Sequence, residues 1–122
     1  MNLIEIRHGE LVKDLTDSLA ARGVTTGLIW FFGQVERFEM SSGPLGSVTM
    51  LDQPAEICSG QGELVGGLPQ LHALMRLADG TVQGRLHSAL VGAHGVRVWV
   101  QPQHAFTGQW GGPVAARDGW MT

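Results

Sequence analysis

The chain is poor in charged residues and has a single cysteine. Lys and Arg total 8 and Asp and Glu total 11, so the net charge is −3, and charged residues make up 16% of the chain. An average soluble domain contains roughly 25%. The basic residues are scattered along the chain, and this disfavours autonomous binding of nucleic acid, which needs a clustered basic face.

The scarcity of cysteine and of long apolar runs limits where the protein works. Cys58 is alone, which excludes an intramolecular disulfide and is typical of a reducing compartment. No apolar run is long enough for a membrane span, and the first six residues lack the parts of a secretory signal. We therefore expect a cytoplasmic protein with no membrane partner. The length predicts a single domain over 1–122, with its core at about 4–100.

Only one segment has the helical period. Between Glu10 and Arg22, Leu11, Leu15 and Leu19 recur every four residues on one face of a predicted amphipathic helix, which Gly23 then caps. One helix among many strands predicts an α+β fold with a mainly antiparallel sheet. Alternating or β-branched segments predict strands over 2–7, 24–32, 35–40, 47–51, 55–59, 62–65, 71–77, 81–90 and 96–100.

The C-terminal residues follow neither period. Residues 103–122 are rich in glycine but contain Trp110 and Trp120. Large rings of this kind need an apolar surface to cover them. We expect this tail to pack on the domain or on a neighbouring subunit.

One short motif resembles the opening of histidine phosphatases. Arg7-His8-Gly9-Glu10 follows a predicted strand, and in that family a histidine takes the phosphoryl group while an arginine holds its charge. That family usually has threonine where Leu11 stands, and its fold needs several parallel βα units that this sequence lacks. The simpler interpretation is a strand that runs into a helix N-terminus, where Glu10 favours the dipole.

A broader resemblance covers most of the chain. From about Ile4 to Val100, the order and spacing of several short motifs resemble the PPC family, the plant- and prokaryote-conserved domain. That family has a Gly-acidic pair before a helix, a glycine-flanked apolar strand, a Glu-led strand, a His-Ala strand, an Asp-Gly turn and a Gly-led strand. The matching segments here are 9–12, 27–34, 56–62, 71–74, 79–80 and 84–87.

The resemblance implies an α/β fold of the PPC type, a homotrimer, and a function like that of stand-alone bacterial members. Plant members bind DNA through attached basic AT-hook segments, and this chain has no Arg-Gly-Arg-Pro run, so a DNA-associated regulatory role is not carried over. Bacterial members often have three histidines at corresponding positions, and zinc is the metal that such a set implies. Gln70 and Leu86 stand at two of those positions, leaving His72, with His87 one place beyond the third.

His72 and His87 are the principal candidates for chemistry. Each lies seven residues from the predicted Asp79-Gly80 turn, so a simple hairpin places them on opposing or adjacent rungs of one face. They are structural histidines, general acid/base residues with Glu63 or Arg7 orienting a substrate, or zinc ligands.

A zinc site would need further ligands beside the two histidines, because zinc prefers three or four. Gln70 and either Glu56 or Glu63 are the nearest candidates in the sequence, and no cofactor fingerprint is evident.

Two functions stay open for the inter-subunit clefts that a trimer would form. One is binding of a small ligand without catalysis, and the other is an enzyme that uses His72 or His87 in the same clefts. The large rings of Trp30 and Phe31 replace small residues of the family and belong either to the core or to a pocket wall. The candidate ligand-binding residues are Arg7, Glu10, Trp30, Phe31, Gln70 and Arg85.

Overall fold

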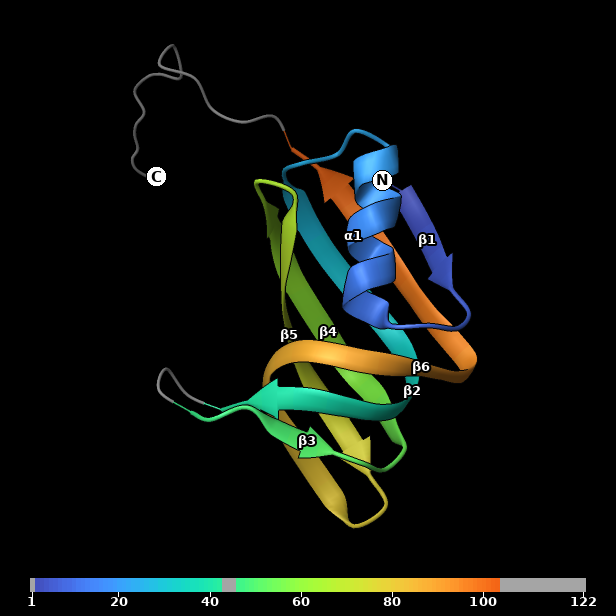
Figure 1. Cartoon of the computed structure of the whole chain (residues 1–122), viewed down its shortest axis with the longest axis vertical. Helices are drawn as coiled ribbons and strands as arrows, with labels where there is room; N and C mark the ends of the chain where they lie inside the picture. The colour runs from blue at the N-terminus through green and yellow to red at the C-terminus, as the bar shows by residue number, and fades with distance from the viewer. Residues whose placement is uncertain (1, 43–45, 104–122) are drawn as a thin grey trace.

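A computed structural model describes residues 2–42 and 46–103, so the predicted tail over 103–122 lies outside the described residues except at its first position. Among the described residues, no helix combines the length and the apolar character needed to cross a membrane. The elements, in chain order (Figure 1), are β1 (Asn2–Ile6), α1 (Leu11–Ala21), β2 (Gly27–Ser41), β3 (Thr49–Leu51), β4 (Ala55–Val65), β5 (Leu68–Leu77) and β6 (Gly80–Pro102).

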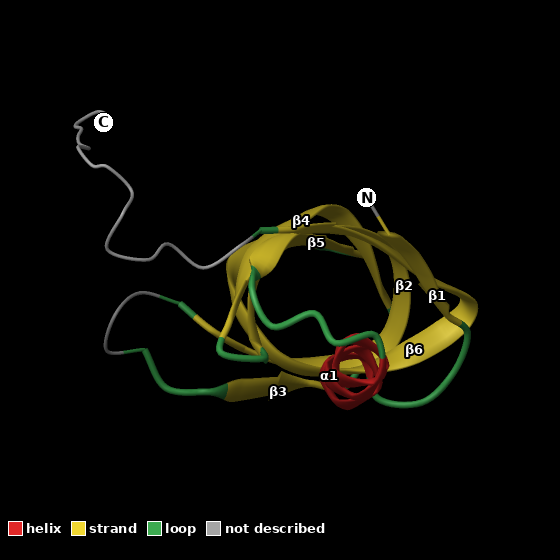
Figure 2. Cartoon of the chain, turned by 90° about the horizontal axis from the view of Figure 1, so that it is seen from above, coloured by secondary structure: helices red, strands yellow, loops and turns green. Residues whose placement is uncertain are grey.

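The strands form one antiparallel sheet that closes on itself. Its order is β1-β6-β5-β4-β2-β3, and a further pairing of β6 with β2 closes the ring. Both long strands bend, so that residues 27–33 of β2 pair with 96–102 of β6 and residues 35–41 pair with 85–91. Figure 2 shows the resulting ring of strands from above, with α1 at one side. The predicted α+β class and mainly antiparallel sheet are confirmed within the described residues.

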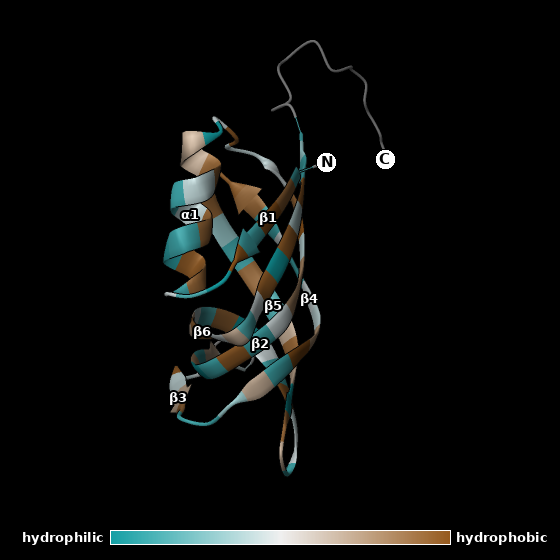
Figure 3. Cartoon of the chain, turned by 90° about the vertical axis from the view of Figure 1, so that its right-hand side faces the viewer, coloured by the Kyte–Doolittle hydropathy of each residue, from teal (hydrophilic) through white to brown (hydrophobic). Residues whose placement is uncertain are grey.

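The inner wall of this barrel is entirely apolar. Every buried side chain among the described residues is hydrophobic, and the helix stripe of Leu11, Leu15 and Leu19 is fully buried at 0% exposure. The alternation of Val96, Val98 and Val100 also points inward, as predicted. In Figure 3 the brown apolar residues of α1 and the strands alternate with polar ones, as expected for elements with one buried face.

Glu10 joins the helix to the sheet. Its carboxylate accepts hydrogen bonds from the backbone N–H groups of Val12, Lys13 and Ala89, each at 2.9 Å. Two of these N–H groups belong to the first turn of the helix, where backbone N–H groups have no carbonyl acceptor within the helix. At the other end Gly23 has a φ of +71°, the left-handed conformation expected of a C-terminal cap.

Three pairs of predicted strands are single strands in the structure. Segments 24–32 and 35–40 belong to β2, 55–59 and 62–65 to β4, and 81–90 and 96–100 to β6. Bulges rather than breaks occur in these strands, at Gly33 in β2, over residues 92–95 in β6, and between Ile57 and Ser59 in β4. At Gly33 an added Cβ would lie 2.3 Å from the Gly95 carbonyl oxygen, so two strands meet where only glycine fits.

Candidate functional site

The outward-facing side chains form a continuous row across the sheet. Neighbouring strands are paired such that each residue in the row lies opposite the next. The row is apolar over β1, β6 and β2 and polar over β4, β5 and the start of β6. Its members, in spatial order, are Leu3, Trp99, Trp30, Gln61, His72 and Arg85. We name this set the outer row.

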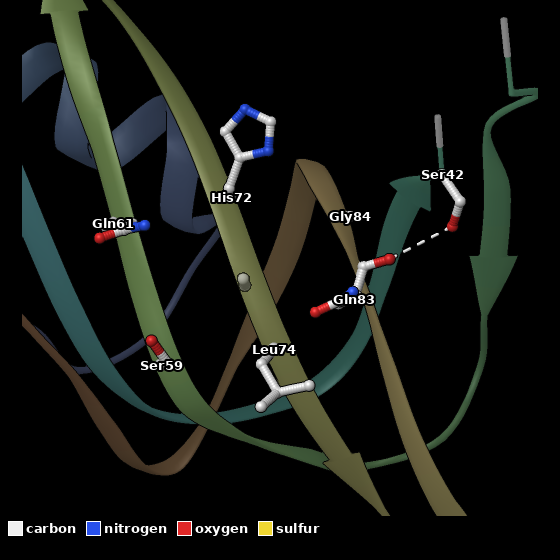
Figure 4. Close-up of a pocket in the computed structure, with 8 residues that line it drawn as sticks. Ser42, Ser59, Gln61, His72, Leu74, Gln83 and Gly84 are labelled. Atoms are coloured by element: carbon white, nitrogen blue, oxygen red, sulfur yellow. Dashed lines mark hydrogen bonds between the residues drawn. The ribbon is translucent and has the colours of Figure 1, made fainter. Parts of the chain in front are cut away.

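A groove of about 590 Å³ lies over the polar half of the outer row. Figure 4 shows side chains from β4, β5 and β6 side by side around it, with the Ser42 hydroxyl donating to the Gln83 carbonyl at 3.2 Å. The groove is lined mainly by hydroxyl, amide and imidazole groups: Ser42, Ser59, Gln61, His72, Ala73, Leu74, Gln83 and Gly84. We name it the His72 groove.

A second hollow of about 380 Å³ continues from the His72 groove toward the apolar half of the outer row. Gln61 and His72 line both spaces. The second hollow adds the ring of Trp30 and the carboxylate of Glu63. The structure therefore brings together three of the residues that the sequence singled out, namely His72, Trp30 and Glu63.

The hairpin of β5 and β6 has a different register from the predicted one. Leu77 pairs with Gly80, so Ala78 and Asp79 form the turn, one residue earlier than expected. As a result, Arg85 rather than His87 lies opposite His72. The predicted alternative that places the two histidines on opposing rungs is therefore wrong.

His87 lies where β6 leaves β5. The last paired residues of the β5–β6 ladder are Leu71 and Leu86, and the β2–β6 ladder shifts its register between Glu39 and Met40. Nε2 of His87 lies 2.8 Å from the hydroxyl oxygen of Ser41 on β2. This contact gives His87 a structural partner away from the His72 groove.

These positions do not fit a zinc site. The guanidinium-bearing Arg85 is the cross-strand partner of His72, and the imidazole of His87 is bonded to Ser41. Within residues 2–42 and 46–103, there is no group of three or more His, Cys, Asp or Glu side chains placed to hold a metal ion. Zinc sites need three or four such ligands.

Two other residues predicted to bind a ligand, Phe31 and Gln70, do not line the His72 groove. Phe31 is 1% exposed and belongs to the core, so its ring does not reach the groove. Gln70 is exposed on β5 opposite Glu63 of β4, one step beyond the outer row.

The Arg7-His8-Gly9-Glu10 segment is a strand-to-helix connection. Arg7 is exposed, with its guanidinium 3.6 Å from the Glu5 carboxylate, and Gly9 has a φ of +93°. The carboxylate of Glu10 is occupied by three backbone N–H groups. The segment thus provides the helix cap that the simpler sequence interpretation expected.

Sequence reasoning missed Ser59, Gln61 and Gln83, which line the His72 groove. A signal for two of them was present, because Ser59, Gln61 and Glu63 alternate with glycines and apolar residues along one strand. Such alternation places them on one face. Gln83 was not recognisable without the register of the hairpin.

The arrangement defines a class of fold, an antiparallel barrel closed by two bent strands and covered by one helix. The chain matches no protein-family model and no curated protein. Its similarity to solved structures is clear, and it shows a PPC-like fold, as the sequence motifs indicated.

Three solved structures illustrate the likeness. A plant- and prokaryote-conserved protein from Pyrococcus horikoshii has a TM-score of 0.72 at 15% identity, with 86% of this chain and 79% of that chain covered. A metal-containing protein from Archaeoglobus fulgidus has a TM-score of 0.73 at 22% identity, covering 83% and 77%. A provisionally named DNA-binding protein from Bacteroides thetaiotaomicron has 0.72 at 22% identity, covering 82% and 76%.

Proposed function

We propose that this protein is a non-catalytic PPC-like subunit that assembles as a homotrimer and binds a small neutral ligand in the His72 groove. The observation that carries the proposal is the outer row, which places an apolar strip beside a polar groove on one side of the sheet. The apolar strip supplies the contact with a neighbouring copy, and the groove supplies the ligand site in the cleft beside it.

The apolar strip supports self-association. Leu3 is 47% exposed although it lies beside two tryptophans on the outer face, and Trp30 and Trp99 are half-buried. Aromatic residues are enriched in the centres of protein interfaces, where charged residues are depleted. Contiguous exposed apolar surface of this kind marks interaction sites on soluble proteins.

The chemistry of the groove supports a neutral ligand rich in hydroxyl or amide groups. Gln61, Gln83 and Ser59 offer both donors and acceptors, and His72 adds a ring nitrogen of either kind. The groove volume of about 590 Å³ falls within the usual range for small-molecule sites. The Trp30 ring at the adjoining hollow provides an apolar surface for the carbon skeleton.

A catalytic use of the same space is the second candidate. Glu63 and His72 line one hollow, so an imidazole and a carboxylate are available to one molecule bound there. Such a pair is suited to proton transfer. Turnover that is lost in both Glu63→Gln and His72→Ala would favour this candidate over simple binding.

DNA binding by the isolated chain is not proposed, although two of the similar solved structures are provisionally named as DNA-binding proteins. The net charge of the chain is −3, and the basic side chains Lys13 and Arg76 each lie within ion-pair distance of a carboxylate. Counterion release needs several unpaired cations aligned along a phosphate backbone. We expect no salt-sensitive binding to duplex DNA tighter than about 10⁻⁶ M in a fluorescence anisotropy titration.

The ligand site is tested by saturation-transfer NMR with a panel of monosaccharides, polyols and small amides. We expect at least one compound to receive saturation from the wild type and to lose it in both Gln61→Ala and His72→Ala. Arg37→Ala, an exposed change on β2 outside both hollows, is the matched control and should retain binding. The absence of any binding compound, or binding that survives both groove variants, would overturn the proposal.

A further inference from the structure

A second groove lies at the corner where β6 turns from one half of β2 to the other. The β2–β6 register passes from Gly33 opposite Val96 to Val35 opposite Val91, so residues 92–95 loop out of the ladder. Gly95 has a φ of +75°, which favours glycine. The corner presents His94 as an exposed side chain.

This corner groove has a volume of about 470 Å³. It is lined by Phe32, Gly33, Gln34, Glu56, Ile57, His94, Gly95 and Arg97, none of which lines the His72 groove or its adjoining hollow. It is therefore a separate space from the His72 groove and its adjoining hollow.

The charges around the corner groove leave a cationic group facing it. Its one carboxylate, Glu56, forms an ion pair with Arg76, which raises the pKa of that guanidinium. Among the described residues, Arg97 contacts a carboxylate only through its Nε atom, which lies 3.5 Å from the Glu5 carboxylate. Glu5 is itself shared with Arg7, 3.6 Å away. Two arginines thus share one carboxylate, on a chain whose net charge is −3.

An apolar wall lies directly opposite Arg97. Its cross-strand partner is Phe32, whose side chain is 46% exposed. The Phe32 ring is held edge-on by Trp99, with ring centroids 5.4 Å apart and an interplanar angle of 69°. Ile57, 3% exposed, contributes a second apolar residue to the lining. A fixed aromatic wall and a guanidinium on neighbouring strands match a ligand that is apolar at one end and anionic at the other.

We propose that the corner groove binds a small carboxylate that carries an aromatic ring. The carboxylate pairs with Arg97 and accepts a hydrogen bond from His94 or the Gln34 amide. The ring packs against Phe32.

The test uses benzoate as the probe and backbone amide shifts as the readout, on the full-length ¹⁵N-labelled protein. The expected affinity for so small a ligand is about 1 mM. Gly33 and Gly95 report on the corner groove, and Gly84 and Gly62 report on the His72 groove and its adjoining hollow. We expect benzoate to shift Gly33 and Gly95, whereas neutral benzamide and ring-free acetate shift neither.

Arg97→Gln should weaken benzoate binding at least about tenfold, because a charge-assisted pair is lost. Arg37→Gln removes an exposed arginine outside the groove and should leave the titration unchanged. The proposal is overturned if benzoate shifts only Gly84 and Gly62, if Arg97→Gln binds as well as the wild type, or if benzamide binds equally well. Each of these results leaves the His72 groove proposal standing or falling on its own experiment.

Discussion

The two walls of the same sheet are built by different rules. Among the described residues, the buried side chains of the inner wall are all apolar. Their packing in the barrel does not depend on which apolar residue lies beside which. The outer wall carries the outer row, in which the identity of each cross-strand neighbour decides what the surface can do. A periodic pattern is enough to build the first wall, but the second also requires the register of every strand pair.

The largest difference in stability is expected between a substitution in the buried core and a substitution on the outer wall. Leu15→Ala, at a fully buried position of α1 in the same hydrophobic core as the inner wall, should lower the free energy of unfolding by roughly 2–4 kcal/mol, since a large core side chain is removed. Leu68→Ala, at a position 65% exposed, should cost less than about 0.5 kcal/mol. Urea denaturation measures both. Equal losses in the two variants would show that the distinction between the walls is unfounded.

Glu10 links the helix to β6 and should rank next. Glu10→Ala removes an acceptor from three backbone N–H groups and should cost about 1–2 kcal/mol in the same denaturation experiment. Glu36→Ala, an exposed change on β2, serves as the control and should have little effect. An unchanged stability in Glu10→Ala, combined with altered ligand binding, would instead assign Glu10 to a binding site.

The two histidines should differ in their effect on stability, because among the described residues a side-chain hydrogen bond is found for His87 and not for His72. His87→Ala loses the contact with Ser41 and should destabilise the protein by about 1 kcal/mol. His72→Ala removes an exposed side chain and should change stability by less than about 0.5 kcal/mol while abolishing ligand binding in the groove. The reverse order of the two losses would contradict the roles assigned to them.

The smallest effect is expected from the exposed pair of Lys13 and Asp17, whose atoms lie 2.8 Å apart. Asp17 raises the pKa of Lys13, mainly through the hydrogen bond. The pair therefore stabilises the folded state at neutral pH, and this contribution is lost as the pH rises through the folded-state pKa. In thermal unfolding, wild type and Asp17→Asn should differ slightly at neutral pH and converge at strongly alkaline pH. A difference that grows with pH would contradict this sign.

The sequence predicted the parts of the fold that depend on period alone. The helix with its Leu11, Leu15 and Leu19 face, the cap at Gly23 and the inward valines of β6 all follow from local spacing. The sequence could not predict which glycines would bend a strand and which would end it, since both are compatible with the same residue. Long strands such as β2 and β6 were therefore divided at internal glycines.

The candidate site was predicted only in part, and the cause is the hairpin turn. Asp79-Gly80 is a favoured turn pair, but the structure uses Ala78 and Asp79, with Gly80 at a φ of +152° as the first residue of β6. Moving the turn by one residue replaces His87 with Arg85 opposite His72. His72 and Trp30 were nevertheless identified from the resemblance to the PPC family, and Glu63 as a nearby carboxylate, none of which depends on the register.

Light scattering gives the mass of the native protein and tests the proposed trimer interface before and after a change in the apolar strip. We expect about three times the chain mass of 13.1 kDa for the wild type. Trp99→Ser should weaken association by about 2 kcal/mol, or roughly thirtyfold, and yield smaller species at low concentration. A wild-type monomer at micromolar concentration, or a trimer unaffected by Trp99→Ser, would contradict the assignment of the outer row to an interface beside a ligand groove.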